Sequence, residues 1–268
     1  MSLTYTTVPL QVKGVNLQLA TIHNLNSQPP ILFLHGFGSC KEDLADIGLH
    51  SNLQQYGFIA FDAPGCGHST SDKLSATDIP FLVATAEALL AEFKIDKFHI
   101  MGHSMGGLTA LLLAHRYPSR VLSFIDIKGN LAPEDCFLSR QIFTFHSDNP
   151  EVFLDEFINR TRQAKSFASP LYSSTLRARV RAEAIRPIFE SMVYLSDGED
   201  LLGMFLRLPF PKMFMFGEEN RGLSYLSHLE SEGVALAEIP DSGHFPMYSN
   251  PVEMYRRIAG FLQKVDIK

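Results

Sequence analysis

A serine stands between two glycines at the point where an apolar run gives way to a helical stretch. The motif is Gly102-His103-Ser104-Met105-Gly106, which follows residues 98–101 and precedes residues 108–117. A strand that turns sharply into a helix needs glycine two positions before and two after the turn residue, because larger side chains would clash. The serine hydroxyl then projects at a helix N-terminus, where backbone N–H groups and the helix dipole favour negative charge. The motif therefore predicts an activated alcohol.

Short apolar runs alternate with amphipathic stretches along the whole chain. We predict strands at 17–23, 31–34, 58–61, 98–101, 121–127, 212–216 and 236–239, and helices at 42–56, 78–94, 105–117, 222–232 and 250–264. This alternation predicts an α/β fold, with a mostly parallel twisted sheet flanked by helices. A G-x-S-x-G string arises by chance in on the order of one chain in ten of this length. The flanking strand and helix therefore decide against an incidental serine in a glycine-rich connector.

Residues 131–208 interrupt this alternation and show no strand pattern. We predict that they form a helical cap inserted into a core made of residues 1–130 and 209–268. Such an insertion would lie over the carboxyl edge of the sheet, where α/β proteins bind ligands. Its phenylalanines are expected to form a small core of their own, with some lining an apolar acyl pocket. Its arginines at 177, 179, 181 and 186 are spread over more than one helix face, which predicts a solvated surface, with binding of an anionic group as the alternative.

Composition and charge exclude several classes of partner. The chain has 268 residues, 46% of them hydrophobic, and a net charge of −6 with no lysine or arginine block, so nucleic acid is not an expected partner. No apolar run approaches the roughly 20 residues of a membrane span, so no membrane association is expected. Met1–Thr6 lacks a positive start and an apolar stretch, which predicts a cytoplasmic protein.

The cysteines and histidines give no metal-binding pattern. Cys40, Cys66 and Cys136 are odd in number, widely spaced and without a C-x-x-C pair, which fits a reducing compartment. The histidines show no ligand-pair spacing. We therefore expect no metal and no cofactor.

Three further motifs accompany the serine in a fixed order. His35-Gly36-Phe37-Gly38 follows the strand at 31–34, Asp62 to Ser69 follows the strand at 58–61, and Asp241 to Pro246 lies before the last helix. With the Gly-x-Ser-x-Gly motif between them, this series resembles the α/β-hydrolase superfamily from about residue 17 to residue 262. The resemblance implies an α/β-hydrolase fold, a nucleophile elbow and a catalytic triad, and it is specific to the superfamily rather than to a substrate.

The resemblance implies a role for each matching residue. Ser104 would be the nucleophile and His244 the base that removes its proton. The backbone N–H groups of Phe37 and Met105 would form the oxyanion hole.

Three other polar residues near these motifs are expected to be structural. His35 and His103 would shape loops through hydrogen bonds rather than transfer protons. Asp62 would hold neighbouring backbone N–H groups.

The third member of the triad departs from the family pattern. The acid of most α/β-hydrolases would fall at position 220, which is Asn220 here, and an amide cannot stabilise an imidazolium with a full negative charge. Some members carry the acid after the strand that follows the elbow helix, and Asp126 is the carboxylate in that strand. We therefore predict Asp126 as the acid. The alternatives left open are Glu218, Glu219, Asn220 as a neutral orienting group, or no functional third member.

Lys128 complicates the assignment of Asp126. Strand residues two apart point to the same face, so Lys128 and Asp126 are expected to pair. The pair would lower the pKa of Asp126 and compete with His244 for its carboxylate.

These features together predict a carboxylesterase- or thioesterase-like serine hydrolase. It would cleave an ester or thioester of a small to medium apolar acyl group through an acyl-enzyme. Dehalogenase and epoxide-hydrolase chemistry is disfavoured, because those relatives have an aspartate at the position of Ser104.

Two alternatives stay open. One is another reaction on this scaffold, such as C–C hydrolysis, a lyase reaction or cofactor-free peroxidation. The other is a catalytically weak ligand-binding or regulatory protein, which Asn220 and Lys128 favour. The sequence predicts no oligomeric state.

Overall fold

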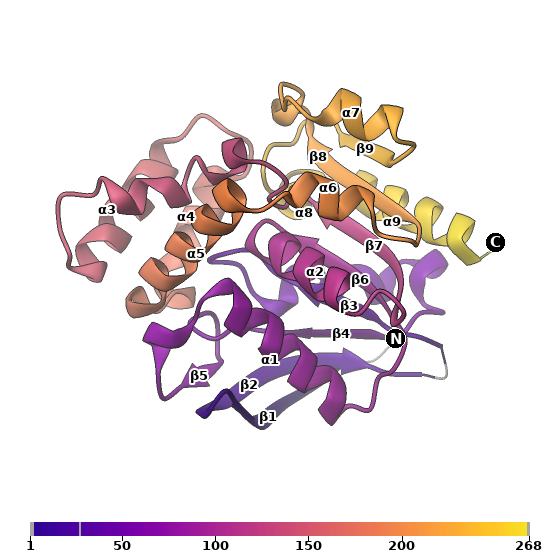
Figure 1. Ribbon diagram of the computed structural model, residues 1–268, viewed down its shortest axis with the longest axis horizontal. Helices are drawn as coiled ribbons and strands as arrows, with labels where there is room; N and C mark the ends of the chain where they lie inside the picture. Colours follow the sequence, from indigo (N-terminus) through magenta and orange to yellow (C-terminus); the bar gives the residue numbers. More distant parts are fainter. Residues whose placement is uncertain (1–2, 27, 267–268) are drawn as a thin grey trace.

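A single mostly parallel sheet runs through the protein (Figure 1). The structure is a computed structural model and describes residues 3–26 and 28–266. Within these residues the sheet has nine strands: β1 (Thr4–Val12), β2 (Val15–Asn24), β3 (Ile31–Leu34), β4 (Phe58–Phe61), β5 (Thr70–Ser71), β6 (Phe98–His103), β7 (Val121–Ile127), β8 (Lys212–Gly217) and β9 (Ala235–Ile239). The order is β1-β2-β4-β3-β6-β7-β8-β9, with β5 beside β2. All pairs from β4 to β9 are parallel, whereas the pairs made by β2 are antiparallel.

The structure confirms the strands expected from the sequence and adds two. Strands β3, β4 and β7 have the predicted bounds, and the other four differ by a few residues at their ends. Strand β1 was not predicted because it lies at the sheet edge with only Val8 and Val12 buried, so its sequence lacks a clear apolar face. Strand β5 has two residues, too few to leave a pattern.

The helices pack on both faces of the sheet, with α1 and α2 in front and α9 behind in the view of Figure 1. The α-helices are α1 (Ile79–Glu92), α2 (Met105–Arg116), α3 (Pro150–Gln163), α4 (Ser169–Arg179), α5 (Ile185–Gly198), α6 (Leu201–Leu206), α7 (Leu226–Ser231), α8 (Pro246–Ser249) and α9 (Pro251–Asp266). The 3₁₀-helices are η1 (Lys41–Leu49), η2 (Ser51–Leu53), η3 (Leu74–Ala76), η4 (Pro133–Cys136), η5 (Ser139–Phe143), η6 (Ala182–Ala184) and η7 (Glu218–Asn220).

Two helix predictions are wrong in detail. The single helix expected at 42–56 is instead the pair η1 and η2, which are separated by the extended backbone of His50. Within η1, the non-helical backbone of Leu44 makes a kink. The helix expected at 222–232 begins only at Leu226. In both places the sequence has the right apolar periodicity, but local turns replace continuous α-helix.

Residues 131–208, the helical segment, contain helices and no strand among the residues described. Helices α3, α4 and α5 lie together beyond one end of the sheet (Figure 1). The rings of Phe153, Phe157 and Phe189 are buried against one another with centroids 5.9–6.2 Å apart, so these three form a core within the segment. Phe137, Phe143 and Phe167 are exposed, so the expected core holds only part of the segment's phenylalanines. Helix α6 differs, because its Phe205 packs edge-on against Phe124 of β7 and so belongs with the sheet.

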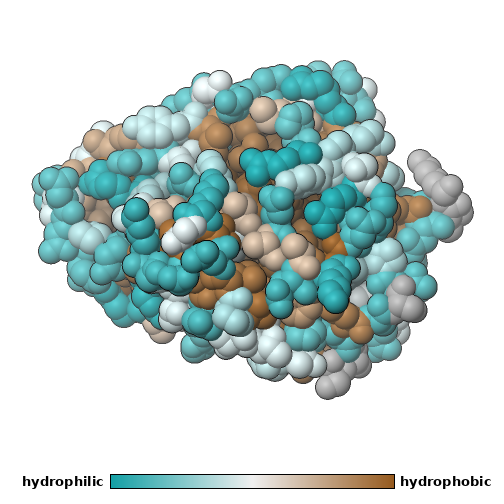
Figure 2. Space-filling model, turned by 60° about the horizontal axis from the view of Figure 1, so that its bottom comes forward, coloured by the Kyte–Doolittle hydropathy of each residue, from teal (hydrophilic) through white to brown (hydrophobic). Residues whose placement is uncertain are grey.

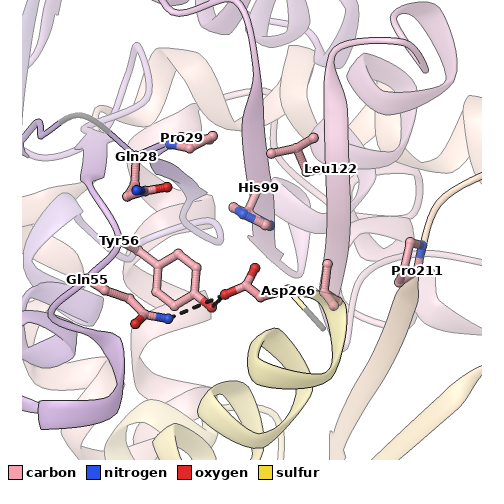
Figure 3. Close-up of a pocket in the computed structure, with 9 residues that line it drawn as sticks. Gln28, Pro29, Gln55, Tyr56, His99, Leu122, Pro211 and Asp266 are labelled. Atoms are coloured by element: carbon pink, nitrogen blue, oxygen red, sulfur yellow. Dashed lines mark hydrogen bonds between the residues drawn. The ribbon is translucent and has the colours of Figure 1, made fainter. Parts of the chain in front are cut away.

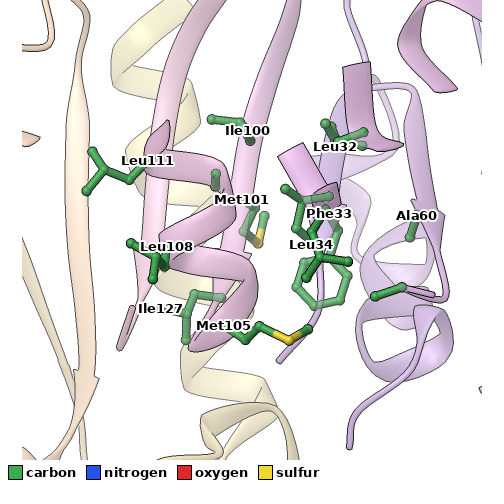
Figure 4. Close-up of a cluster of buried hydrophobic side chains, with 14 of the residues drawn as sticks. Leu32, Phe33, Leu34, Ala60, Ile100, Met101, Met105, Leu108, Leu111 and Ile127 are labelled. Carbon is green, nitrogen blue, oxygen red and sulfur yellow. The ribbon is translucent and has the colours of Figure 1, made fainter. Parts of the chain in front are cut away.

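A dense apolar cluster holds the turn between β6 and α2 in place (Figure 4). Leu34 of β3, Met101 of β6 and Met105 of α2 are all buried in it. Burying one such side chain stabilises the fold by about 1.5–3 kcal/mol. The position of Ser104 is therefore fixed by the interior of the protein.

The surface is mainly polar, with apolar patches near the centre of the face shown in Figure 2. No helix in the described residues is long and apolar enough to cross a membrane. Met1 and Ser2, part of the stretch used to predict localisation, lie outside the described residues.

Candidate active site

Ser104 occupies a strained turn between β6 and α2. Its backbone angles are φ 53° and ψ −119°, a region that non-glycine residues occupy at a cost of about 1–3 kcal/mol. A side chain at Gly106 would place Cβ 2.0 Å from the carbonyl oxygen of Leu34, and one at Gly102 would place it 2.4 Å from the carbonyl oxygen of Gly106. Only glycine fits at both positions, as the sequence predicts. Ser104 itself is partly exposed.

Ser104 and His244 line the same cavity, although they are 140 positions apart in sequence. We call this space of about 40 Å³ the inner cavity. Its other lining side chains are mainly apolar and come mostly from the helical segment: Phe37, His103, Asp135, Phe137, Leu138, Ser139, Phe157, Tyr172, Phe189, Met192 and Phe245. The helical segment therefore covers the carboxyl ends of the central strands, where the serine lies.

A second space, the outer cavity, has a volume of about 210 Å³ and shares part of its wall with the inner cavity. The shared residues are Phe137, Leu138, Phe157, Tyr172, His244 and Phe245. The outer cavity adds polar side chains: Gln141, Arg160, Thr161, Ser166, Ser169, Glu219 and Asn220. His244 thus stands where the two cavities meet.

A larger cavity of about 680 Å³ lies at the opposite edge of the sheet (Figure 3). It is lined by His99 at the start of β6, Leu122 at the start of β7 and Pro211 just before β8. Nδ1 of His99 is 2.8 Å from Oγ of Ser123. Because Ser104 follows the other end of β6, this cavity is separate from the site with the serine.

His244 is held through its backbone, while its imidazole is free to act. Its carbonyl oxygen accepts a hydrogen bond of 2.8 Å from Nε2 of His103. Nδ1 of His244 is buried and has no hydrogen-bond partner among the described residues. Burial lowers the pKa of His244 well below its usual value, and the neighbouring His103 and the positive charge of Lys128 lower it further. His244 is therefore neutral near pH 7 and able to accept a proton.

The two amides predicted for the oxyanion hole flank Ser104. Met105 begins α2 directly after the serine, and Phe37 lies in the loop after β3. The carbonyl of Phe37 accepts a 2.6 Å hydrogen bond from the hydroxyl of Tyr172, and its ring packs against Phe189 with centroids 4.6 Å apart. The described residues provide no hydrogen-bond acceptor for either amide. The helical segment therefore positions the Phe37 loop and leaves its N–H available.

Tyr172 was missed by sequence reasoning, since one tyrosine in a helix carries no signal of its partner. Replacing it by phenylalanine removes one hydrogen bond to the Phe37 carbonyl while keeping the ring that stacks on Phe245. We expect kcat for an ester substrate to fall by about 5–10-fold, since a net hydrogen bond contributes about 1 kcal/mol. Steady-state kinetics beside a thermal unfolding curve would measure this. An unchanged kcat would show that Tyr172 does not position the loop.

His35 and His103 have the structural roles expected from the sequence. Nε2 of His35 accepts from the backbone N–H of Ala63 at 2.8 Å, so its protonated Nδ1 donates to the carbonyl of Gly36 at 2.7 Å. His103 is buried, and burial lowers its pKa to about 4. Both histidines are thus committed to backbone contacts.

The structure does not bring Asp126 to His244. Oδ1 of Asp126 accepts a 2.7 Å hydrogen bond from the backbone N–H of Gly129, and a side chain on Gly107 of α2 would clash with the same oxygen. Oδ2 is buried without a partner among the described residues. Burial raises the pKa of Asp126 to about 7, against the opposing effect of the Gly129 N–H. A contact that would support Asp126 as the acid is therefore lacking.

The three other candidates for the third member lie in η7 after β8. Oε2 of Glu218 accepts from the N–H of Asp241, and its Oε1 faces Arg221, so this carboxylate is engaged on the surface. Glu219 is exposed and accepts a 3.2 Å hydrogen bond from the N–H of Phe167. Glu219 and Asn220 line the outer cavity together with His244.

Asn220 and His244 each leave one polar atom unsatisfied. Oδ1 of Asn220, like Nδ1 of His244, is buried and without a hydrogen-bond partner among the described residues. Buried polar atoms without partners are rare in native proteins, and each one calls for an explanation. Oδ1 of Asn220 can accept a hydrogen bond and a protonated Nδ1 of His244 can donate one, so these two atoms of the same cavity are complementary.

Lys128 pairs with Asp135 of η4, so the expected pair with Asp126 is wrong. The Lys128 ammonium and the Asp135 carboxylate form a buried ion pair, and the Tyr225 hydroxyl donates to the same carboxylate at 3.0 Å. Asp135 also accepts from the N–H groups of Leu131 and Ala132 at 2.9 and 3.0 Å. The helical segment thus supplies a partner that strand periodicity could not indicate. A cation, rather than a carboxylate, stands close enough to His244 to influence its pKa.

The described residues contain one group of potential metal ligands, made of Cys40, Glu42 and Asp62. The ammonium of Lys41 already occupies it, at 2.7 Å from Glu42 and 2.9 Å from Asp62. Burial raises the pKa of Cys40, which disfavours the thiolate that a metal would need. Asp62 also accepts from the N–H groups of Lys41 and His68, which confirms its predicted role in ordering backbone.

Comparison with known proteins gives the family of this chain. Residues 29–251 match the family model described as alpha/beta hydrolase fold, and the chain belongs to that family. A putative esterase/lipase of Mycoplasma pneumoniae is 23% identical over 87% of this chain and 89% of its own length. A structure of a thermophilic esterase from Thermogutta terrifontis superimposes with a TM-score of 0.75 at 19% identity, covering 99% of both chains.

Another relative matches only in part. The dihydrolipoyllysine-residue acetyltransferase component of the acetoin cleaving system of Cupriavidus necator is 37% identical over 35% of this chain. The match spans 24% of that relative's length.

Proposed function

We propose that this chain is a serine hydrolase that cleaves a carboxylic ester or thioester of a small to medium apolar acyl group. The observation that carries the proposal is the placement of Ser104, on a strained turn, in the same cavity as His244. The esterase and esterase/lipase names of the relatives support the same class of reaction. The part of residues 131–208 that precedes α6 would act as a cap over the core. The three buried, free cysteines support a reducing, cytoplasmic location.

The proposed reaction has two stages. Oγ of Ser104 attacks the acyl carbon while its proton passes to His244, which then gives that proton to the departing alcohol or thiol. Water next attacks the acyl carbon of the acyl-enzyme and gives its proton to His244. His244 returns that proton to Oγ of Ser104 as the acyl–oxygen bond breaks, which releases the acid and the free serine. The N–H groups of Phe37 and Met105 stabilise the oxyanion in both stages. Each such donor contributes on the order of 3 kcal/mol to the transition state.

We assign the role of orienting His244 to Asn220 in place of Asp126. The oxygen of Asn220 is unpartnered in the cavity that His244 lines, whereas Asp126 is bound to Gly129. The amide oxygen would accept from Nδ1–H and leave Nε2 free to take the proton of Ser104. An amide provides orientation without a full negative charge, so the imidazolium intermediate is stabilised less than in a triad with a carboxylate.

A panel of substrates tests the proposal. We expect saturable, catalytic release of acid from 4-nitrophenyl acetate, 4-nitrophenyl butyrate and a butyryl thioester. A β-diketone, followed by product analysis, covers C–C hydrolysis as the competing reaction on this scaffold. Turnover of the β-diketone without turnover of any ester would contradict the proposal.

A ligand-binding protein with weak turnover is the second candidate. It is favoured by Asn220 at the position of the usual acid and by the Lys128 charge acting on His244. This candidate predicts that the esters bind and protect the protein against thermal unfolding, while no acid is released over buffer controls.

The pH profile should reflect the environment of His244. The neutral imidazole of His244 is the active form. Because the pKa of His244 lies well below the usual 6.5, the imidazole becomes protonated only at a correspondingly lower pH. We expect kcat/KM to stay flat from pH 8 to 6.5 and to fall only at lower pH. Rates in buffers of constant ionic strength, with circular dichroism at each pH to follow unfolding, would measure this. A half-maximal rate at or above pH 7 would contradict the described environment.

A further inference from the structure

The two cavities differ in size and in chemistry, and this difference bears on the substrate. The inner cavity, beside Ser104, measures about 40 Å³. A water molecule needs about 10–15 Å³ of such space, so the inner cavity admits only a few non-hydrogen atoms. Phe37, Phe189 and Met192 give it an apolar wall. It therefore suits a short acyl chain of about two to four carbons.

The outer cavity lies on the side where the alcohol half of an ester would leave. In the proposed reaction His244 protonates the leaving oxygen, and His244 stands where the two cavities meet. The outer cavity, at 210 Å³, has about five times the volume of the inner one, at 40 Å³. Its polar groups are hydroxyls, amides, the guanidinium of Arg160 and the carboxylate of Glu219. It therefore suits a polar alcohol half.

Arg160 is the cation in the wall of the outer cavity. Its Nη1 donates to the side-chain oxygen of Gln141, and its Nε donates to the carbonyl of Glu156 at 3.4 Å. No carboxylate forms an ion pair with Arg160 among the described residues. Glu219, which lines the same cavity, accepts instead from the N–H of Phe167. The charge of Arg160 is therefore available to a ligand.

Four other arginines of the helical segment are paired with carboxylates. Arg140 lies 2.6 Å from Asp197, Arg177 lies 2.5 Å from Glu151, and Arg186 lies 3.1 Å from Glu190. Arg179 is paired with Asp43 at 3.4 Å. Among the described arginines of the helical segment, Arg160 is the one that lines the outer cavity, and its charge is unpaired.

We propose that the substrate joins a short acyl group to an alcohol that bears a negative charge, and that Arg160 recognises that charge. This inference rests on the proposed ester hydrolysis and names its substrate class. A guanidinium binds a carboxylate or phosphate through charge-assisted, often bidentate, hydrogen bonds. The acyl group would occupy the inner cavity and the charged alcohol the outer one. Arg160 is thus a residue that determines specificity.

A matched pair of chromogenic esters tests the charge preference. The esters are 4-nitrophenyl butyrate and 3-carboxy-4-nitrophenyl butyrate, which share the acyl group and differ in one carboxylate. The quantity compared is the kcat/KM of the carboxylated ester divided by that of 4-nitrophenyl butyrate. Dividing this ratio by the ratio of their alkaline hydrolysis rates corrects for intrinsic reactivity. We expect the corrected ratio of the wild type to be about ten. The preference should shrink as salt is raised, because salt screens an exposed charge.

Two glutamine variants on α3 test whether the charge preference comes from Arg160. Arg160→Gln is expected to bring the corrected ratio close to one, and Arg160→Lys to keep part of it. Arg162→Gln is the matched control, because Arg162 is exposed on the same helix and does not line the cavity. It is expected to keep the wild-type ratio and rates. An equal effect of both glutamine variants would overturn the assignment to Arg160.

Chain length tests the inner cavity, and the outcomes separate the two proposals. With the same carboxylated alcohol, we expect kcat/KM to drop at least tenfold from butyryl to octanoyl. If both butyrates are hydrolysed without a charge preference, the substrate inference fails while ester hydrolysis stands. If neither butyrate is hydrolysed, the substrate inference fails, and the acetate ester and the butyryl thioester then decide whether the proposed hydrolysis stands. Faster turnover of the octanoyl ester would overturn the short-chain part.

Discussion

Replacing Ser104 by alanine is expected to lower kcat for ester substrates by about 10⁴–10⁶-fold, since loss of a catalytic serine has effects of this size. Alanine keeps Cβ at the strained turn, so the backbone and the oxyanion amides of Phe37 and Met105 remain in place. The variant should therefore fold like the wild type. Steady-state hydrolysis of 4-nitrophenyl butyrate, with thermal unfolding followed by circular dichroism, would measure both properties.

A serine outside the site provides the control for this substitution. Ser231 is exposed on α7 and its hydroxyl donates to the carbonyl of His228, so Ser231→Ala should keep wild-type kinetics. If Ser104→Ala retained a rate within tenfold of the wild type, the serine mechanism would be wrong. Unfolding of Ser104→Ala would shift the test to covalent labelling of the wild type.

Replacing Asn220 by aspartate is expected to raise kcat by about 10–10³-fold. Exchanging the triad carboxylate of a serine protease for an amide lowers kcat by about 10⁴-fold, so restoring a carboxylate should recover part of this factor. Recovery should be incomplete, because the nearby Lys128 lowers the pKa of His244 and opposes its protonation. The new charge should also raise the pKa of His244 and move the acid limb of the pH profile upward. Full pH–rate profiles of both proteins would measure the two effects together.

Two controls decide which residue supports His244. Asn52→Asp adds the same charge at an exposed position of η2 and should leave rate and profile unchanged. Asp126→Asn should change kcat by less than tenfold if Asn220 has the orienting role. A loss of about 10³-fold in folded Asp126→Asn, with no gain in Asn220→Asp, would instead establish Asp126 as the acid.

The sequence was sufficient for the parts of the site that depend on local backbone geometry. Gly102 and Gly106 are required by contacts with backbone atoms less than 3 Å away, so the motif itself encodes the turn. The strands that end at the site are buried apolar runs, which periodicity detects well. Strand β1 and the 3₁₀-turns of η1 were missed, because an exposed edge strand and a kinked turn leave weak patterns.

The sequence could not decide between the candidates for the third member of the site, because the choice depends on contacts between distant loops. Lys128 was expected to pair within its own strand, yet its partner is Asp135 from the helical segment. Spacing places Asp126 and Lys128 on one face, but it does not reveal that Asp126 turns toward Gly129. The place of Arg160 in the cavity wall likewise depends on how α3 packs.

The most direct test of the central claim is labelling by a fluorophosphonate, read by intact-protein mass. Such a probe reacts with a serine whose hydroxyl is activated by a neighbouring base and whose phosphonyl oxygen finds oxyanion donors. We predict that the wild type gains the mass of one probe and that Ser104→Ala gains none. A folded wild type that stays unlabelled, or equal labelling of Ser104→Ala, would contradict the assignment of Ser104 as an activated nucleophile.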